Sequence, residues 1–261
     1  MGKWNSSVTR VAPIFDRLFT DDPSGANWLA GLLNLGSRAA EVDIPKIRPL
    51  LIEGHGPTWG PSELALPAPL LLLEHLVHSI TPRQVAESGG SPYTRGKREA
   101  LAVRDADTVA EALRALRSGN RGRKWYVLEG ASKPDATLNM EDAVLVVEGK
   151  RTERSCTSTT TWMGVRSQLL RHMDAAMEHF PGKAVFGLLL VEGEGGAEAL
   201  APSQYWANES MAQFDSSMLS SSLPHRSPED RSRMASGILG VATWQAVCAQ
   251  NDIPWPPVQD V

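Results

Sequence analysis

The chain has 261 residues, of which 42% are hydrophobic and 21% are charged, and its formal net charge is −4. These values are those of an ordinary globular protein with a sizeable core, and they exclude a polycationic protein, so any nucleic-acid contact must come from a local basic patch. The two cysteines, Cys156 and Cys248, are far apart, so neither a disulfide framework nor a zinc site is expected. The N-terminus lacks an apolar signal core, and the apolar stretch LPAPLLLLEHLV is too short to span a bilayer. We therefore expect a cytoplasmic protein with no membrane partner.

The first part of the chain shows weak apolar periodicity, and helical patterns follow it. Residues 1–60 are expected to form an N-terminal appendage packed on the core, with short helices near 12–20 and 27–35. From Pro61 the pattern sharpens, and further helices are predicted over the ranges 70–80, 81–90 and 106–119.

The middle of the chain alternates between apolar bursts and an amphipathic helix. Three strands are predicted at Trp125–Leu128, Asp135–Leu138 and Ala143–Val147, and their short connections favour an antiparallel meander. A helix within 163–180 and a buried strand within 183–196 follow. The order helix, three strands, helix, strand predicts an α/β core over 61–200, with a mixed central sheet flanked by helices.

The tail, residues 201–261, is expected to be a helical extension of the same domain. Ser227-Pro228 is a good start for a helix that runs on through GILGVATWQAVCAQ. The residues just before it, His225 and Arg226, are expected in an exposed loop.

Two carboxylates and a lysine stand out in the central stretch. Glu148 and Lys150 are two residues apart on a predicted strand, so they project from the same face. Hairpin-like pairing would bring Asp135 to the same end of the sheet. Two carboxylates are suitable ligands for Mg²⁺, and a nearby lysine can stabilise the charge that develops on a phosphate.

Pro134-Asp135 followed by Glu148-Gly149-Lys150 resembles the signature of the PD-(D/E)xK nuclease superfamily, which has the restriction-endonuclease-like fold. The resemblance implies an αβββαβ core, metal ligands at Asp135 and Glu148, and a catalytic Lys150, with Mg²⁺ or Mn²⁺ as cofactor. The family often carries a further metal-assisting Glu on the helix before the strands. Glu63 and Glu74 are the two candidates, and we favour Glu63 because Glu74 could equally be a surface residue of its helix.

Some branches of the superfamily carry a Gln-x-x-x-Tyr motif on the helix after the lysine. Gln168 matches the Gln of that motif, and His172 stands where the Tyr would be. We expect Gln168 to steady the site or to contact substrate, and we interpret His172 as a core or surface histidine.

These features predict a metal-dependent nuclease that hydrolyses phosphodiester bonds of DNA, an endonuclease, with DNA as partner and a homodimer as an open alternative to a monomer. The residues expected to contact phosphates are basic ones near the motif, namely Arg114, Arg117, Arg121, Arg123, Lys124 and Arg151. Two alternatives remain open. One is a catalytically silent nuclease-like binding module in a larger DNA defence or repair assembly, and the other is a metal-dependent phosphoesterase that acts on RNA.

Overall fold

The structure is a computed structural model that describes residues 6–42, 57–122, 124–153, 155, 157–158 and 160–257. Arg123, one of the expected phosphate contacts, lies outside the described residues. Within the described ranges, no helix is both long enough and apolar enough to cross a membrane.

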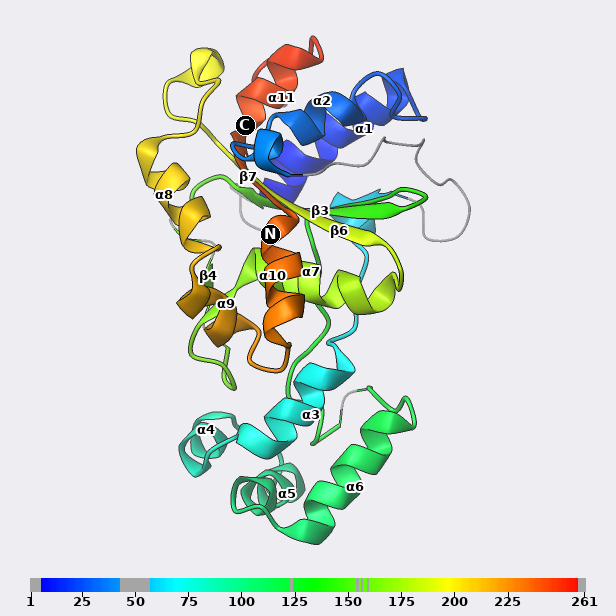
Figure 1. The fold of residues 1–261 in the computed structure, drawn as a ribbon, viewed down its shortest axis with the longest axis vertical. Coiled ribbons are helices and arrows are strands. Elements are labelled where there is room, and N and C mark those ends of the chain that lie inside the picture. The colour runs from blue at the N-terminus through cyan, green and yellow to red at the C-terminus, as the bar shows by residue number, and fades with distance from the viewer. Residues whose placement is uncertain are drawn as a thin grey trace.

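A five-stranded mixed sheet is the centre of the larger part of the molecule (Figure 1). Its order is β1-β2-β3-β6-β7, with β1, β2 and β3 antiparallel to one another and β3, β6 and β7 parallel. The strands are β1 (Thr58–Trp59), β2 (Ala136–Asn139), β3 (Ala143–Lys150), β6 (Ala184–Val191) and β7 (Ile238–Thr243), and a separate two-stranded sheet pairs β4 (Thr157–Ser158) with β5 (Arg166–Ser167). The predicted α/β class with a mixed central sheet is thus confirmed.

Helices cover both faces of this sheet. Successive side chains of β3 point to opposite faces, so each face contributes to a separate core. Leu145 and Val147 pack in one core with α1 (Ala12–Asp21), α2 (Leu29–Asn34) and α11 (Trp244–Gln250). Val144 and Val146 pack on the opposite side, in a core with α7 (Gln168–His179), α9 (Ser216–Ser222) and α10 (Pro228–Ser236). Glu148 and Lys150 continue the second series, so β3 directs them to the side of α7.

The remaining elements are short. The helix α8 (Gln204–Ala212) packs Trp206 against β6 and β7. The chain also contains a π-helical turn η1 (Ser7–Val11) and 3-10 turns η2 (Ala39–Glu41), η3 (Gly60–Ser62) and η4 (Gly196–Glu198). Both predicted short helices of the N-terminal part are confirmed, as α1 and α2.

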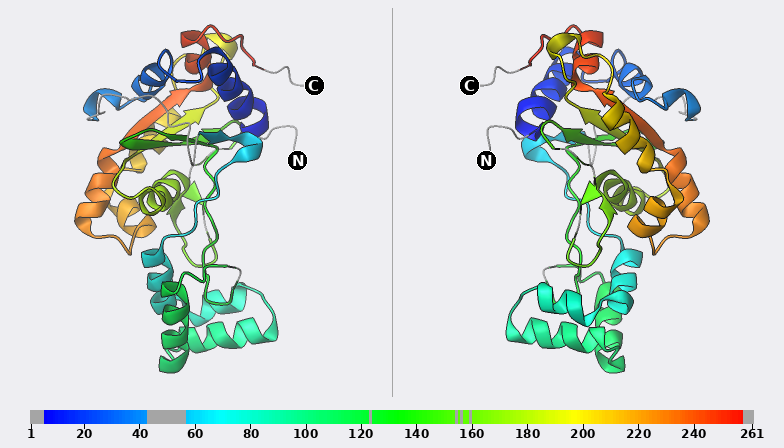
Figure 2. Two further views of the ribbon diagram at one scale, coloured as in Figure 1. Left: turned by 90° about the vertical axis from the view of Figure 1, so that its right-hand side faces the viewer. Right: turned by 90° about the vertical axis from the view of Figure 1, so that its left-hand side faces the viewer.

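A helical unit is inserted between β1 and β2 and projects away from the sheet (Figure 2). It contains α3 (Leu70–Ser79), α4 (Pro82–Glu87), α5 (Pro92–Ala102) and α6 (Ala106–Arg117), which share a core of their own. We call residues 70–128 the helical arm. Two connecting segments, 63–69 and 129–134, join it to the sheet, and we call them the stalk. Backbone hydrogen bonds of 2.8 and 2.7 Å between Leu66 and Ser132 hold these segments together.

The strand predicted at Trp125–Leu128 is wrong. Trp125, Tyr126 and Leu128 are buried in the core of the helical arm, and Arg98 Nε donates a 3.0 Å hydrogen bond to the carbonyl oxygen of Trp125. A short apolar run is compatible with any buried segment, so its composition could not identify the partner. The strand next to β2 is instead the two-residue β1.

Two further expectations are corrected by the structure. The run after Gly237 is not a continuous helix, because Ile238–Thr243 forms β7 at an edge of the sheet. His225 and Arg226 are not exposed, since their side chains are 1% and 8% accessible and both contact the buried Asp174. The sequence pattern also gave no prediction for α5.

Candidate active site

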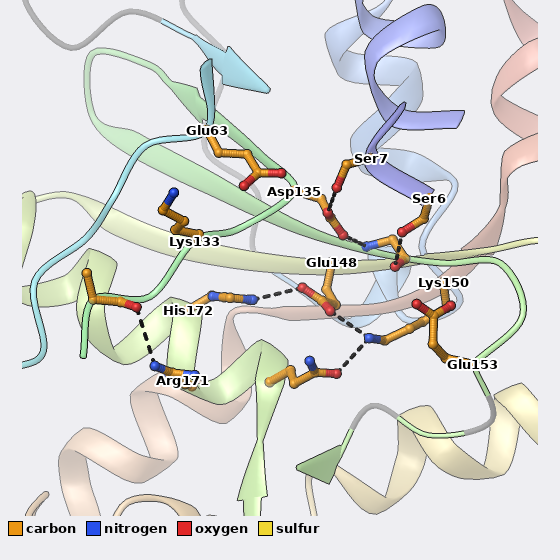
Figure 3. A pocket seen from close by; sticks show the side chains of 13 residues that line it. Ser6, Ser7, Glu63, Lys133, Asp135, Glu148, Lys150, Glu153, Arg171 and His172 are labelled. Atoms are coloured by element: carbon orange, nitrogen blue, oxygen red, sulfur yellow. Dashed lines mark hydrogen bonds and ion pairs between the residues drawn. The ribbon is translucent and has the colours of Figure 1, made fainter. Parts of the chain in front are cut away.

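A pocket of about 680 Å³ lies where the end of β3, the start of α7, the turn η1 and the stalk meet (Figure 3). Ser6, Ser7, Glu63, Ala131, Lys133, Asp135, Glu148, Gly149, Lys150, Glu153, Gln168, Arg171 and His172 line it. Nearly all of these side chains are polar or charged. All four residues expected to be catalytic are among them, although they come from three separate parts of the chain.

Lys150 is held by two acceptors at the floor of this pocket. Its Nζ donates hydrogen bonds to Glu148 Oε1 at 2.7 Å and to Gln168 Oε1 at 2.6 Å. Gln168 is the first residue of α7, whose start is fixed by the side chain of Ser167 accepting a hydrogen bond from the amide of Leu170. Lys150 is 5% exposed, so this ammonium group has a defined position rather than the mobility of a surface lysine.

Asp135 immediately precedes β2 and reaches across to β3. Its Oδ2 accepts a 2.7 Å hydrogen bond from the amide of Gly149, and its Oδ1 accepts one from the hydroxyl of Ser7. Burial, together with the negative charge of Glu148, raises the pKa of Asp135 to about 6. A second carboxylate charge beside Glu148 is therefore costly in this buried site, and a bound cation would lower that cost.

Glu148 has a different electrostatic environment from Asp135. Burial alone would raise the pKa of Glu148, but the hydrogen bond from His172 and the charges of His172 and Lys150 outweigh it and hold this pKa below its ordinary value. The distance between His172 Nε2 and Glu148 Oε2 is 2.8 Å. Glu148 is thus kept ionised, which is the state that a metal ligand requires.

The two candidates for a third carboxylate are separated by the structure. Glu63 lies on the stalk and lines the pocket, beside Lys133 in Figure 3. Glu74 lies on α3 in the helical arm, where its Oε1 is 2.6 Å from Arg117 Nε. Because α3 belongs to the core of the arm and not to that of the sheet, Glu74 does not line the pocket, whereas Glu63 does.

The chemistry of the pocket fits a hard divalent cation. Carboxylate oxygens from Asp135 and Glu148, with Glu63 at the rim, are the ligand type that Mg²⁺ and Mn²⁺ prefer. Magnesium at phosphate-processing sites is often held by one or two carboxylates, and water and substrate oxygens complete its shell. Among the described residues, no three His, Cys, Asp or Glu side chains are grouped closely enough to form a complete protein cage.

Three of the five described basic residues that were expected to contact phosphate have acidic partners within the protein. Arg117 pairs with Glu74, Arg121 Nη1 lies 2.6 Å from Glu178 Oε1, and Arg151 Nε lies 3.0 Å from Glu192 Oε2. None of these lines the pocket. In contrast, Arg114 and Lys124 are exposed, and no ion pair is found for either of them among the described residues.

Sequence reasoning missed the contribution of the N-terminal segment. Ser6 donates a 3.2 Å hydrogen bond to the carbonyl oxygen of Gly149, so η1 lies directly on the end of β3. A side chain cannot be added at Gly149 without conflict, since its Cβ would come within 2.9 Å of Trp244 Cζ2 and 3.1 Å of Val11 Cγ2. The sequence predicts that residues 1–60 pack on the core, but nothing in its pattern indicates that Ser6 and Ser7 contact the site. The place of His172 in the pocket was also not predicted. The signal for it was its spacing of four residues from Gln168, which places both on one face of a helix.

A buried ion network supports α7 from the side of α9 and α10. Asp174 is fully buried and accepts a 2.7 Å hydrogen bond from Arg226 Nε, with His225 Nε2 at 3.0 Å and Arg166 Nη2 at 3.5 Å. Arg166 also pairs with Glu129 at 3.1 Å. Because Gln168 and His172 belong to the same helix, this network fixes the position of two pocket residues.

Comparison of the chain with models of protein families, with curated proteins and with solved structures finds no significant match.

Proposed function

We propose that the protein is a metal-dependent nuclease that hydrolyses phosphodiester bonds of DNA within the strand. The observation that carries the proposal is the convergence of Asp135, Glu148 and Lys150 in one polar pocket. The same three residues carry the resemblance to the PD-(D/E)xK superfamily. The order β1, β2, β3, α7, β6 is compatible with an αβββαβ core of that superfamily in which α1 supplies the first helix and the arm is an insertion.

Each residue has a role that follows from its contacts. Asp135 and Glu148 would hold Mg²⁺ or Mn²⁺, which when bound polarises the phosphate and lowers the pKa of a water molecule. The ammonium group of Lys150 stands beside Glu148 and faces the pocket, so it can stabilise the negative charge that builds on the phosphate oxygens. Gln168 holds Lys150 in that orientation, and Glu63 lies where it can assist the metal through water.

The charge distribution supports a nucleic acid as substrate. The helical arm contains ten Lys and Arg residues and six Asp and Glu residues, which gives it a net charge of +4. The whole chain has a net charge of −4, so the rest of the molecule carries −8. A basic unit attached next to the pocket can bind a phosphate backbone while the carboxylates of the pocket hold the metal.

A panel of nucleic acids tests the proposal. Plasmid DNA, linear duplex DNA, single-stranded DNA and RNA are incubated with the protein in Mg²⁺, in Mn²⁺ and in EDTA. We expect the plasmid to be nicked or linearised with either metal and to remain intact in EDTA. The variant Lys150→Met should lower the cleavage rate about 10²–10³-fold, the range for loss of one charge-stabilising group.

The control is Arg17→Met, which removes one positive charge from the surface of α1, where Arg17 pairs with Asp21 away from the helical arm. It should cleave like the wild type. Cleavage of RNA alone would favour the phosphoesterase alternative. Binding of DNA without cleavage in either metal would favour the silent module, and equal cleavage by Lys150→Met and the wild type would refute the assignment.

A further inference from the structure

His172 binds the metal-ligand candidate Glu148 on the side away from Lys150. The two oxygens of Glu148 have different partners, Lys150 Nζ at Oε1 and His172 Nε2 at Oε2, at 2.7 and 2.8 Å. His172 lies one helical turn after Gln168, which binds Lys150. One face of α7 therefore fixes both members of the Glu148–Lys150 pair.

The other ring nitrogen of His172 is bound by the stalk. His172 Nδ1 lies 2.6 Å from Ser132 Oγ, and Ser132 exchanges two backbone hydrogen bonds with Leu66. A hydroxyl can donate or accept, so Ser132 satisfies Nδ1 in either protonation state of the ring, and Nε2 remains a donor to Glu148. Ser132, His172 and Glu148 thus form a continuous chain of contacts from the stalk to the pocket.

The contacts of Ser132, His172 and Glu148 involve the same residue types as the nucleophile, base and acid of a serine hydrolase. Ser132 is 2% exposed and does not line the pocket, whereas its neighbours Ala131 and Lys133 do. A nucleophile must reach the substrate, and this hydroxyl does not. The contact of Ser132 with His172 therefore orients the ring.

We propose that His172 is a positioning residue that presents Glu148 to the metal, and that Ser132 fixes the ring of His172. The proposal rests on the metal-dependent nuclease activity proposed above. A carboxylate that ligates a metal is itself held by outer hydrogen bonds, and loss of such a bond typically costs 10–100-fold in metal affinity or activity. It also makes the stalk a part of the site, because Ser132 lies between the sheet and the helical arm.

Four variants separate this role from packing: His172→Leu, His172→Gln, Ser132→Ala and the control His179→Leu on the same helix. Calorimetric titration with Mg²⁺ alone and plasmid cleavage kinetics are measured for each, together with thermal melting. We expect His172→Leu to weaken Mg²⁺ binding and to lower kcat about 10–100-fold with KM for DNA unchanged. His172→Gln, whose amide can still donate to Glu148, should recover part of the loss, and Ser132→Ala should lose less than His172→Leu.

His179→Leu should match the wild type, because His179 is two turns from His172. Wild-type values of Mg²⁺ affinity and kcat in a folded His172→Leu would overturn the proposal. The proposal would also be overturned if His172→Gln and His172→Leu lost Mg²⁺ affinity and kcat equally, in proportion to the decrease in their melting temperatures. If the wild type itself neither binds Mg²⁺ nor cleaves nucleic acid, the proposed function fails, and this result is distinct from a wild type that does both but is insensitive to His172.

Discussion

Charges near the sheet and charges on the helical arm are held in different ways. Around α7 they are buried, as in the pair of Arg166 and Asp174, whose side chains are both 0% exposed. On the arm they lie at the surface, as in the i,i+4 pair of Arg83 and Glu87, whose side chains are 89% and 59% exposed. Buried pairs fix geometry and are costly to break, whereas exposed pairs contribute little to stability. The sheet with the helices packed on it, which we call the sheet unit, thus holds its charged side chains near α7 in fixed positions, whereas the charged side chains on the surface of the arm are available to a ligand.

The largest effect is expected when the buried network is broken. Asp174→Asn leaves the buried guanidinium of Arg166 without one of its carboxylates, and it should lower the free energy of unfolding by about 3–5 kcal/mol. Urea denaturation measures this change. The matched control is Arg83→Gln, which removes an exposed charge and should not change the urea midpoint. Equal midpoints for Asp174→Asn and the wild type would show that the buried charges near α7 contribute no more to stability than the exposed charges of the arm.

The same network should also produce an acid-sensitive component of stability. Burial would raise the pKa of Asp174, but His225, Arg226 and Arg166 outweigh it and hold this pKa below the ordinary value of 3.8. A depressed folded pKa means that the contribution is complete above pH 3.8 and is lost as the pH falls through the folded pKa. The difference in stability between wild type and Asp174→Asn should therefore shrink below that pH.

A smaller effect is expected at the surface of the arm. On α6, Arg114 lies one turn after Glu111, and Lys124 immediately precedes Trp125. Lys97 contacts both Glu111 and Trp125. The double variant Arg114→Glu/Lys124→Glu should weaken DNA binding in EDTA and reduce the slope of log K against log salt by about two, while the urea midpoint stays unchanged.

A control with the same change in charge lies on the sheet unit. Arg17→Glu/Arg233→Glu reverses two exposed arginines that are 60% and 68% accessible and belong to α1 and α10. Fluorescence anisotropy at several salt concentrations should show that this control keeps the wild-type slope. An unchanged slope in the arm variant, or an equal reduction in both variants, would remove the arm from the substrate-binding surface.

The parts of the fold that could be predicted are those with strong local signals. The runs that form β2, β3 and β6 are apolar and closed by polar residues or glycine, and the helix around α7 has a clear apolar stripe. The grouping of Asp135, Glu148 and Lys150 followed from the period of a strand and the geometry of a hairpin, together with a known signature.

The parts that failed depend on contacts between distant segments. Trp125–Leu128 looks like a strand, and only the core of the helical arm decides otherwise. Ser7 reaches Asp135 from 128 residues away, and no local pattern reports such a contact. Likewise, the sequence shows that Arg117 and Arg121 are basic but not that each has an acidic partner within the protein.

The central claim is that Asp135 and Glu148 hold a divalent metal ion, and anomalous diffraction from a crystal grown with Mn²⁺ tests it most directly. We predict an anomalous peak within about 2–2.5 Å of carboxylate oxygens of both residues, the range for such ions with oxygen ligands. Lys150 should stand beside the ion, still bound to Gln168. A protein crystal saturated with Mn²⁺ that shows no peak in this pocket, or a peak bound only by other residues, would contradict the account.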